Sequence, residues 1–150
     1  MEGLGIPGGA MSEKEAELKN PLTLAFIGDT VWDLLVRQRL LTTSARVNAL
    51  HRQATAMVNA GAQAQALTRV EPLLTQRERD IVQRGANAHC KHLAPRNQNP
   101  GDYRHATGLE ALVGWLYLSG QPERIRELFE SAHPSTNAVH STAKEGEADG

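Results

Sequence analysis

The sequence predicts an all-α fold, and three observations support this prediction. Apolar residues recur at helical spacing through most of the chain, and no segment shows the apolar and polar alternation that is typical of a strand. Residues that favour helix starts stand where several of these apolar patterns begin. The chain has 150 residues, 40% of them hydrophobic and 22% charged, which is a balance typical of one globular domain.

The first half of the chain predicts helices from about residue 21 to Val70. Asn20 is a good N-cap and Pro21 suits a first helical position, so a first helix is expected from there to about Leu40. A second helix should begin near Thr43 or Ser44, and helical pattern continues until Glu71-Pro72 ends it. The apolar face of the first helix is expected to consist of Leu22, Ala25, Phe26, Trp32, Leu35, Val36 and Leu40.

The second half predicts three more helices. The run Thr75–Glu78 has the pattern of a capping box and should open a helix that ends near Gly85. The segment from His89 to Asp102 contains two prolines and a glycine, so it is expected to be a loop. A long apolar helix is then predicted over 103–119, and an amphipathic helix is predicted to start at Pro122.

Both ends of the chain lack a helical apolar pattern. Residues 1–17 are rich in glycine and then in charge, so they are expected to form a flexible N-terminal arm. Residues 18–132 should form the folded domain. Residues 133–150 are polar and are expected to be a disordered tail.

Cysteine usage and hydropathy predict a cytoplasmic protein without a membrane segment. Cys90 is the single cysteine, so an intramolecular disulfide is excluded and a reducing compartment fits. The N-terminus lacks the pattern of a signal peptide. The longest weakly charged stretch, 106–120, is too short to span a bilayer and contains Glu110.

The distribution of charge is more informative than its sum. A net charge of -1 does not by itself indicate a nucleic-acid partner. However, the stretch 34–70 contains five arginines and no acid, and the stretch 84–104 contains four basic residues and only one acid, Asp102. The chain can therefore present a basic face, although solvated helix surfaces with scattered arginines explain the same pattern.

Two acids stand out because their neighbours are apolar. Asp29 lies on the apolar stripe of the first helix, and Glu110 is the only charge in the stretch 106–120. Burial of a carboxylate is costly unless it is paired or bound to a metal, so we expect these two acids to meet in the core around a divalent cation. Gly28, Gly108 and Gly114 would let the two helices approach closely. Oxygen ligands with room for water favour Mg²⁺, with Mn²⁺ as a substitute.

Other interpretations of these acids remain open from spacing alone. Asp29 can instead cap a turn, and Glu110 can pair with a buried arginine such as Arg104 or Arg37. Asp33 lies one turn after Asp29, where it would either add an outer-shell oxygen or lie at the solvent edge.

The surroundings of both acids resemble ribonuclease III. Phe26-Ile-Gly-Asp29-Thr-Val resembles that family's signature helix, and Glu110-Ala-Leu-Val-Gly-Trp resembles its second metal-binding helix. The resemblance is stronger for the Mini-ribonuclease III branch. The matching blocks are Asn20–Asp29, Val47-Asn-Ala-Leu-His51, Arg84-Gly-Ala-Asn87-Ala, Pro95-Arg-Asn97 and 103–110, so the resemblance covers about residues 20–129.

The resemblance implies a ribonuclease III endonuclease-domain-like helical bundle in which Asp29 and Glu110 bind the metal. The chain departs from the larger enzymes, which have acids where Ala25 and Thr107 stand and near Leu22. Fewer protein ligands would then leave water or Thr107 to complete the metal shell. The double-stranded-RNA-binding domain of those enzymes is also absent from this sequence.

The resemblance further implies a metal-dependent endoribonuclease that cuts double-stranded RNA and leaves 5′-phosphate ends. It implies a homodimer packed through the signature helix, with Leu22, Phe26 and Trp32 at the interface. It also implies a role in maturing the large-subunit (23S) ribosomal RNA precursor, and a ribosomal protein that presents the RNA is a further expected partner. The RNA-binding residues expected near the duplex are Arg84, Asn87, Lys91, Arg96, Asn97 and Arg104.

Two alternatives compete with the nuclease hypothesis. The loss of acids at Ala25 and Thr107 also fits a catalytically weak or inactive module that binds structured RNA during ribosome assembly. The other alternative is a purely structural helical dimer whose two acids are salt-bridged. The run His89-Cys90-Lys91-His92 resembles a zinc motif only weakly, because a second pair of ligands is missing. His51 and His105 fall in the family blocks, but packing or a helix end explains each equally well.

Overall fold

The structure is a computed structural model, and it describes residues 6, 8–42, 44–88 and 99–135. Within these residues the chain is helical and contains no strand, which confirms the all-α prediction. The elements, in chain order, are α1 (Glu13–Glu17), α2 (Pro21–Leu40), α3 (Val47–Val58), α4 (Ala60–Val70), the 3₁₀ turn η1 (Glu71–Leu73), α5 (Gln76–Ala88), α6 (Pro100–Leu118) and α7 (Pro122–Ala132).

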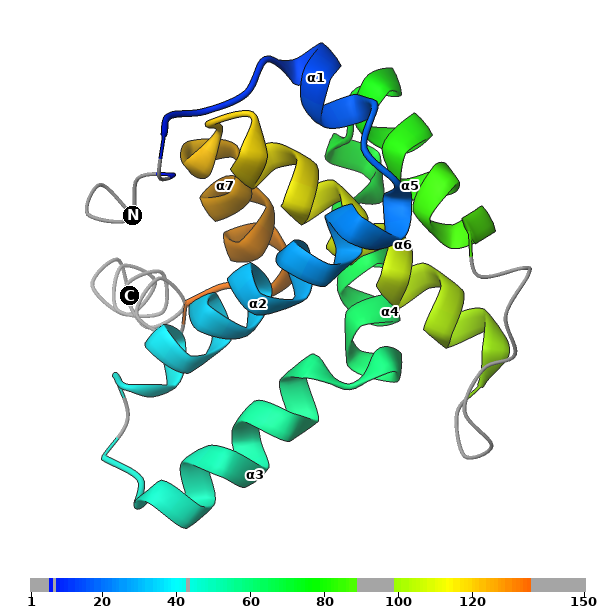
Figure 1. The fold of residues 1–150 in the computed structure, drawn as a ribbon. Helices are drawn as coiled ribbons and strands as arrows, with labels where there is room; N and C mark the ends of the chain where they lie inside the picture. The colour runs from blue at the N-terminus through cyan, green and yellow to red at the C-terminus, as the bar shows by residue number, and fades with distance from the viewer. Residues whose placement is uncertain (1–5, 7, 43, 89–98, 136–150) are drawn as a thin grey trace, which may run out of the picture.

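Helix α6 is the centre of the bundle (Figure 1). It packs against α2, α5 and α4, and also against α1 and α7, while α3 contacts mainly α2. The side chains from Ala106 to Leu109 and from Ala111 to Leu116 are buried, so α6 is apolar on every side over this stretch. A helix surrounded in this way has to be hydrophobic all round, and this explains why Glu110 is conspicuous in the sequence.

Close approach of α2 and α6 depends on two glycines. A Cβ atom on Gly28 would lie 1.7 Å from the carbonyl oxygen of Glu110, and one on Gly114 would lie 1.9 Å from the carbonyl oxygen of Leu24. Backbone therefore contacts backbone where the helices cross. Gly108 was expected to allow the same approach, but it instead lets α6 pack closely on α5, where it contacts Val82.

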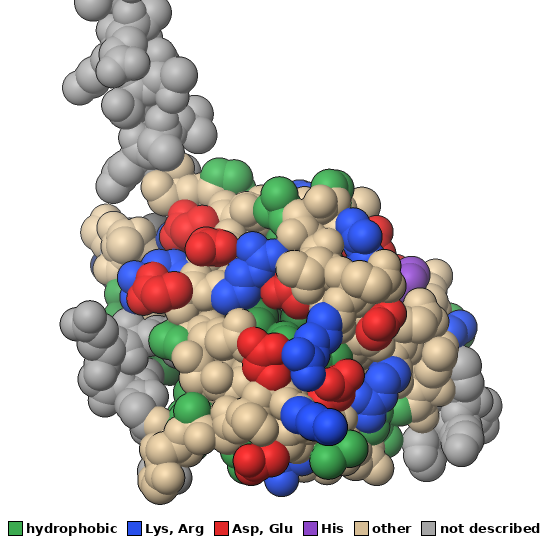
Figure 2. Space-filling model, turned by 90° about the horizontal axis from the view of Figure 1, so that it is seen from above, with side chains coloured by type: hydrophobic (Ala, Val, Ile, Leu, Met, Phe, Trp, Pro, Cys, Tyr) green, Lys and Arg blue, Asp and Glu red, His purple; other side chains and the backbone are tan. Residues whose placement is uncertain are grey.

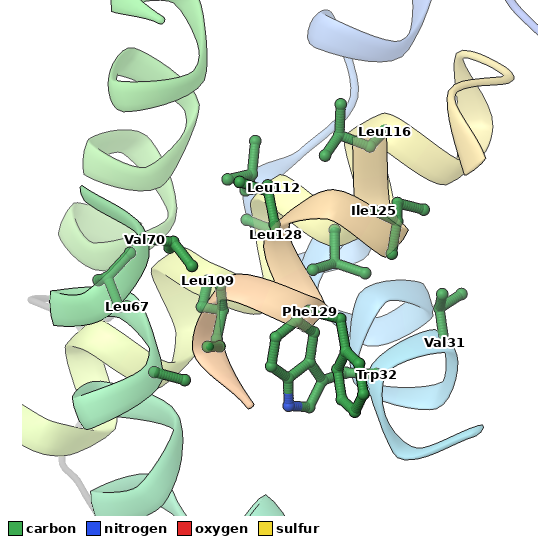
Figure 3. Packing of buried hydrophobic residues seen from close by; sticks show 14 of the residues in the cluster. Val31, Trp32, Leu67, Val70, Leu109, Leu112, Leu116, Ile125, Leu128 and Phe129 are labelled. Atoms are coloured by element: carbon green, nitrogen blue, oxygen red, sulfur yellow. The ribbon is translucent and has the colours of Figure 1, made fainter. Parts of the chain in front are cut away.

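The hydrophobic core lies between α2, α4, α6 and α7 (Figure 3). Trp32 is 0% exposed, and its ring meets that of Phe129 edge to face, with 5.1 Å between ring centroids. The prediction that Trp32 packs across a dimer interface is therefore wrong, because its ring fills the core of its own chain. The sequence could not reveal this, since α7 supplies the partner ring from about a hundred residues away.

Local start signals place most helices correctly. The side chain of Asn20 accepts a hydrogen bond from the Leu22 amide, as predicted for the N-cap of α2. The capping box also forms, because the Glu78 amide donates to Thr75 Oγ1 and the Thr75 amide donates to Glu78 Oε1. Helix α6 differs, since it begins at Pro100 with Asn99 as its N-cap, three residues before the predicted start.

The N-terminal arm predicted over 1–17 is partly wrong. Residues 13–17 form α1, whose Ala16 is 0% exposed. The indole Nε1 of Trp115 donates to the carbonyl oxygen of Glu13 over 3.0 Å, and Arg77 forms ion pairs with Glu13 and Glu17. These long-range contacts hold a helix that is too short to be stable alone.

The domain also extends slightly beyond the predicted end at residue 132. The carbonyl oxygen of His133 accepts a hydrogen bond from Arg39, and the imidazole lies 5.5 Å from the ring of Phe129. Burial, followed by the charges of Arg69 and Arg39, lowers the pKa of His133. The rest of the predicted tail, 136–150, lies outside the described residues.

Among the described helices, none has both the length and the apolar character needed to cross a membrane.

Candidate metal and RNA site

The two conspicuous acids meet in one cleft, the acid-pair cleft, with a volume of about 460 Å³. It lies between α2, the α3–α4 junction and α6. The residues that line it are Leu22, Ala25, Phe26, Asp29, Val58, Asn59, Ala60, Gln63, Tyr103, Ala106, Thr107 and Glu110.

The helix crossing explains why the acids are neighbours. Gly28 packs on the backbone of Glu110, and Asp29 is the next residue along α2. The Glu110 side chain is half-buried and interacts with the Asp29 carboxyl group. The prediction that the two acids converge from separate helices is therefore supported by the geometry.

One part of that prediction is wrong, because Asp29 is exposed and not buried in the core. The apolar stripe predicted for α2 is interrupted on the side of the cleft, where Phe26 is also exposed. Helical periodicity identifies residues that share a face, but it does not show whether a neighbouring helix covers that face.

Burial, the charge of Asp29 and their hydrogen bond raise the pKa of Glu110 to about 9. Burial disfavours the ionised carboxylate, and the negative charge of Asp29 disfavours it further. In the metal-free protein at neutral pH, Glu110 is therefore protonated.

The arginines considered as alternative partners are engaged elsewhere. Arg37 Nε donates to Asp33 over 3.0 Å, and Arg104 Nε donates to the carbonyl oxygen of Ala86 over 3.3 Å. The same ion pair places Asp33 against Arg37, and Asp33 does not line the acid-pair cleft. Thr107 does line it, but its hydroxyl donates to the carbonyl oxygen of Tyr103.

The donor set fits a divalent cation that keeps much of its water. The described residues contain no group of three or more His, Cys, Asp or Glu side chains arranged for a metal. Mg²⁺ is commonly bound through one or two carboxylates while it retains several waters, so Asp29 and Glu110 suffice for this mode. A cation would also replace the proton that Glu110 carries at neutral pH.

Three of the predicted RNA-binding residues, Arg84, Asn87 and Arg104, are described, and they lie on α5 and α6. Arg84 and Asn87 lie in the last turns of α5, and Arg104 contacts the end of the same helix through Ala86. Arg84 also has a structural role, because its Nη1 donates to the carbonyl oxygen of Glu17 over 2.8 Å. Lys91, Arg96 and Asn97, like the His89–His92 run, lie outside the described residues.

Among the residues that the structure describes, those on the face that carries α1 form no continuous basic patch. In Figure 2, acidic and basic side chains alternate over this face. The ion pairs of Arg77 with Glu13 and Glu17 belong to it. Such an arrangement offers little net attraction for a polyanion.

Sequence reasoning missed the wall that the α3–α4 junction contributes. Asn59 caps α4, and Gln63 is 3% exposed. The only signal in the sequence is a glutamine at an otherwise apolar helical position, followed by the buried Ala66 and Leu67. Glutamine is usually exposed, so this signal is weak.

Comparison with known proteins agrees with this fold. Residues 22–121 match the family described as Ribonuclease III domain. This span runs from the start of α2 past the end of α6, so the helical bundle is a ribonuclease III domain.

Relatives place the chain more narrowly. It is 50% identical over 113 residues to Mini-ribonuclease 3 of Symbiobacterium thermophilum, covering 75% of this chain and 86% of that protein. It is 43% identical over 120 residues to Mini-ribonuclease 3 of Brevibacillus brevis, covering 79% and 89%. A crystal structure of protein FN1578 from Fusobacterium nucleatum superposes with a TM-score of 0.68 at 29% identity, covering 75% of this chain and 90% of that one. The chain belongs to the Mini-ribonuclease 3 family, and its activity is that of an endoribonuclease.

Proposed function

We propose that the chain hydrolyses phosphodiester bonds of double-stranded RNA in the acid-pair cleft, with Asp29 and Glu110 holding a divalent cation. The proposal depends on one observation: two acids from separate helices meet in an open cleft, where the pKa of Glu110 is raised to about 9. Mg²⁺ is the proposed metal, with Mn²⁺ as a substitute. When bound, such a cation lowers the pKa of a coordinated water and offsets charge on the phosphate.

The chain's own residues position this chemistry. The contact of Gly28 with the Glu110 backbone holds the two acid-bearing helices close together. Attack of water at phosphorus, with cleavage of the bond to the 3′ oxygen and protonation of that leaving oxygen, would leave 5′-phosphate and 3′-hydroxyl ends. Thr107 lies in the wall of the cleft between Tyr103 and Glu110, and we propose only an outer-shell role for it.

RNA recognition is proposed for the α5–α6 junction. Arg84, Asn87 and Arg104 lie there in the structure, and Lys91, Arg96 and Asn97 belong to the segment that connects the two helices. A-form RNA presents phosphates and 2′-hydroxyl groups, so cationic and amide side chains suit shape-directed binding. Binding should weaken steeply with salt.

A homodimer is proposed through the exposed side of α2. Phe26 is 80% exposed and lines the acid-pair cleft together with Leu22. A large exposed aromatic side chain on the helix that carries Asp29 favours a symmetric contact. Each subunit would then supply one site, and each site would cut one strand.

The proposed cellular role is maturation of the large-subunit (23S) ribosomal RNA precursor in the cytoplasm, with a ribosomal protein presenting the RNA. Deletion of the gene should then cause precursor with unprocessed ends to accumulate. Normal ends in the deletion strain would refute this role without affecting the proposed chemistry.

Incubation of the purified protein with a labelled RNA duplex, with and without Mg²⁺, tests the chemistry. Cleavage should require the metal and should be lost in Asp29→Asn and Glu110→Gln. Asp33→Asn is the matched control, because this acid is on the same helix but pairs with Arg37 outside the cleft. Salt-sensitive binding without any cleavage would instead indicate an RNA-binding module, and cleavage that survives in both variants would exclude the proposed site.

A further inference from the structure

Gln63 is a buried polar residue in the wall of the acid-pair cleft. It is 3% exposed, and its side-chain Nε2 is buried without a hydrogen-bond partner among the described residues. The residue lines the cleft from α4, whereas Asp29 lines it from α2.

An unsatisfied amide at this position is costly for folding. Leaving a buried donor without a partner costs about 1–3 kcal/mol, and most buried polar groups in native proteins are satisfied. The buried neighbours of Gln63 on α4 are apolar, namely Ala64, Ala66 and Leu67. Leucine would fill a similar volume without this cost, so stability alone does not explain a glutamine here.

The other neutral polar groups of the wall are already engaged. The Asn59 amide nitrogen donates to the carbonyl oxygens of Thr55 and Ala56, and its Oδ1 accepts from the Ala62 amide. The Thr107 hydroxyl donates to Tyr103, and Tyr103 also has a partner. Among the described lining residues, Gln63 therefore holds the uncommitted N–H donor.

The charged groups of the cleft explain what this donor is suited to bind. Asp29 and Glu110 are both acids, and the described lining residues include no cation. A phosphodiester presents only acceptor oxygens, and ionised carboxylates repel it. A neutral donor attracts a phosphate oxygen without competing with the carboxylates for a cation.

We infer that Gln63 donates a hydrogen bond from its carboxamide to a non-bridging oxygen of the scissile phosphodiester. This inference rests on the proposed function of the cleft. The last side-chain torsion of glutamine is broad, so the amide can turn toward the cleft at little cost when RNA enters. Its missing partner is then supplied by substrate, and a donor aimed at a reacting phosphate stabilises the charge on its oxygens.

The test compares Gln63→Leu with Gln65→Leu, a change of the same kind at an exposed position two residues further along α4. Three quantities are measured: the melting temperature, Mn²⁺ affinity without RNA, and the single-turnover cleavage rate of a duplex at saturating enzyme. Gln63→Leu should melt at the same temperature or higher and bind Mn²⁺ like the wild type. Its cleavage rate should fall at least about tenfold, while Gln65→Leu should cut normally.

A phosphorothioate at the scissile position identifies the contacted oxygen. In each of the two phosphorothioate diastereomers, sulfur replaces one non-bridging oxygen. The diastereomer with sulfur at the contacted oxygen should lower the cleavage rate of the wild type more than that of Gln63→Leu, because the variant has already lost this hydrogen bond. If Gln63→Leu misfolds, Gln63→Met replaces it, since methionine is also unbranched and close in volume.

The outcomes separate this inference from the proposed function. Unchanged cleavage by a stable Gln63→Leu protein would show that the residue only packs, and weakened Mn²⁺ binding would assign the amide to the cation; either result overturns the inference. In both cases, cleavage by the wild type and its loss in Asp29→Asn would leave the proposed function intact. If the wild type does not cut duplex RNA at all, both proposals fail.

Discussion

Substitution of Gly28 by alanine tests whether the α2–α6 crossing sets the geometry of the acid pair. The added Cβ would lie 1.7 Å from the carbonyl oxygen of Glu110, whereas real Cβ contacts essentially never fall below 3.0 Å. The two backbones must therefore separate locally by about 1.3 Å. The obstacle is backbone of a buried helix, so no flexible side chain can move aside.

This separation should affect stability and activity together. Forcing extra volume into a packed contact commonly costs 1–3 kcal/mol, and here the contact is backbone to backbone, so we expect a loss of at least about 3 kcal/mol in unfolding free energy. A displacement of about 1 Å at a reacting centre can lower the rate about 100-fold. Urea unfolding gives the first quantity, and duplex cleavage at a temperature where the variant is folded gives the second.

Gly61→Ala is the matched control. Its Cβ would lie 3.5 Å from Asn59 Oδ1, an ordinary contact, and alanine is the better residue in a helix. We expect this control to be as stable as the wild type or up to about 1 kcal/mol more stable. The reasoning is refuted if Gly28→Ala unfolds within 1 kcal/mol of the wild type, roughly the size of a helix-propensity effect, and cleaves RNA at the wild-type rate.

Three further predictions concern other contacts. Because the pKa of Glu110 is raised to about 9, its contribution to the stability of the metal-free protein is fully present only below the unfolded pKa of about 4.5. Between these values the unfolding free energy should fall by up to about 1.4 kcal/mol for each unit of rising pH. Urea titrations at several pH values should show this slope for the wild type and lack it for Glu110→Gln. Arg124→Met should cost about 3–5 kcal/mol in thermal or urea unfolding, because it removes the cationic partner of the buried Glu78 carboxylate and leaves it only the Thr75 amide. Arg126→Met, which removes only an exposed pair, should be nearly neutral. Phe26→Ser should leave the melting temperature of the monomer unchanged but shift the mass in sedimentation to that of one chain; a dimer that persists would exclude the proposed α2 interface.

Much of the helix layout was predictable because its signals are local. Asn20 and Pro21 start α2, and Thr75 and Glu78 close a capping box, through hydrogen bonds that span at most three residues. The start of α3 was less well predicted. Its N-cap, Arg46, makes no side-chain capping bond, so the sequence has no marker for the first turn.

The acid pair was predictable for a different reason. Burial of a carboxylate in an apolar stretch costs free energy, so two such acids on separate helices predicted that the acids contact each other. The structure supports this prediction. Which acid is buried was not predictable. Asp29 is exposed because α3 and α4 leave the cleft open beside it, whereas Glu110 is half-buried within α6.

The sequence by itself therefore determined the helical class, most helix boundaries and which two acids are candidate site residues. Each of these features depends on residues within a few turns of one another. Only the tertiary structure decided that α1 docks on Trp115, that Trp32 fills the core against Phe129, and that Gln63 lies buried beside the acids. These features depend on contacts between segments far apart in the chain. Such contacts are set by the packing of whole helices, and the spacing of residues along one helix does not encode them.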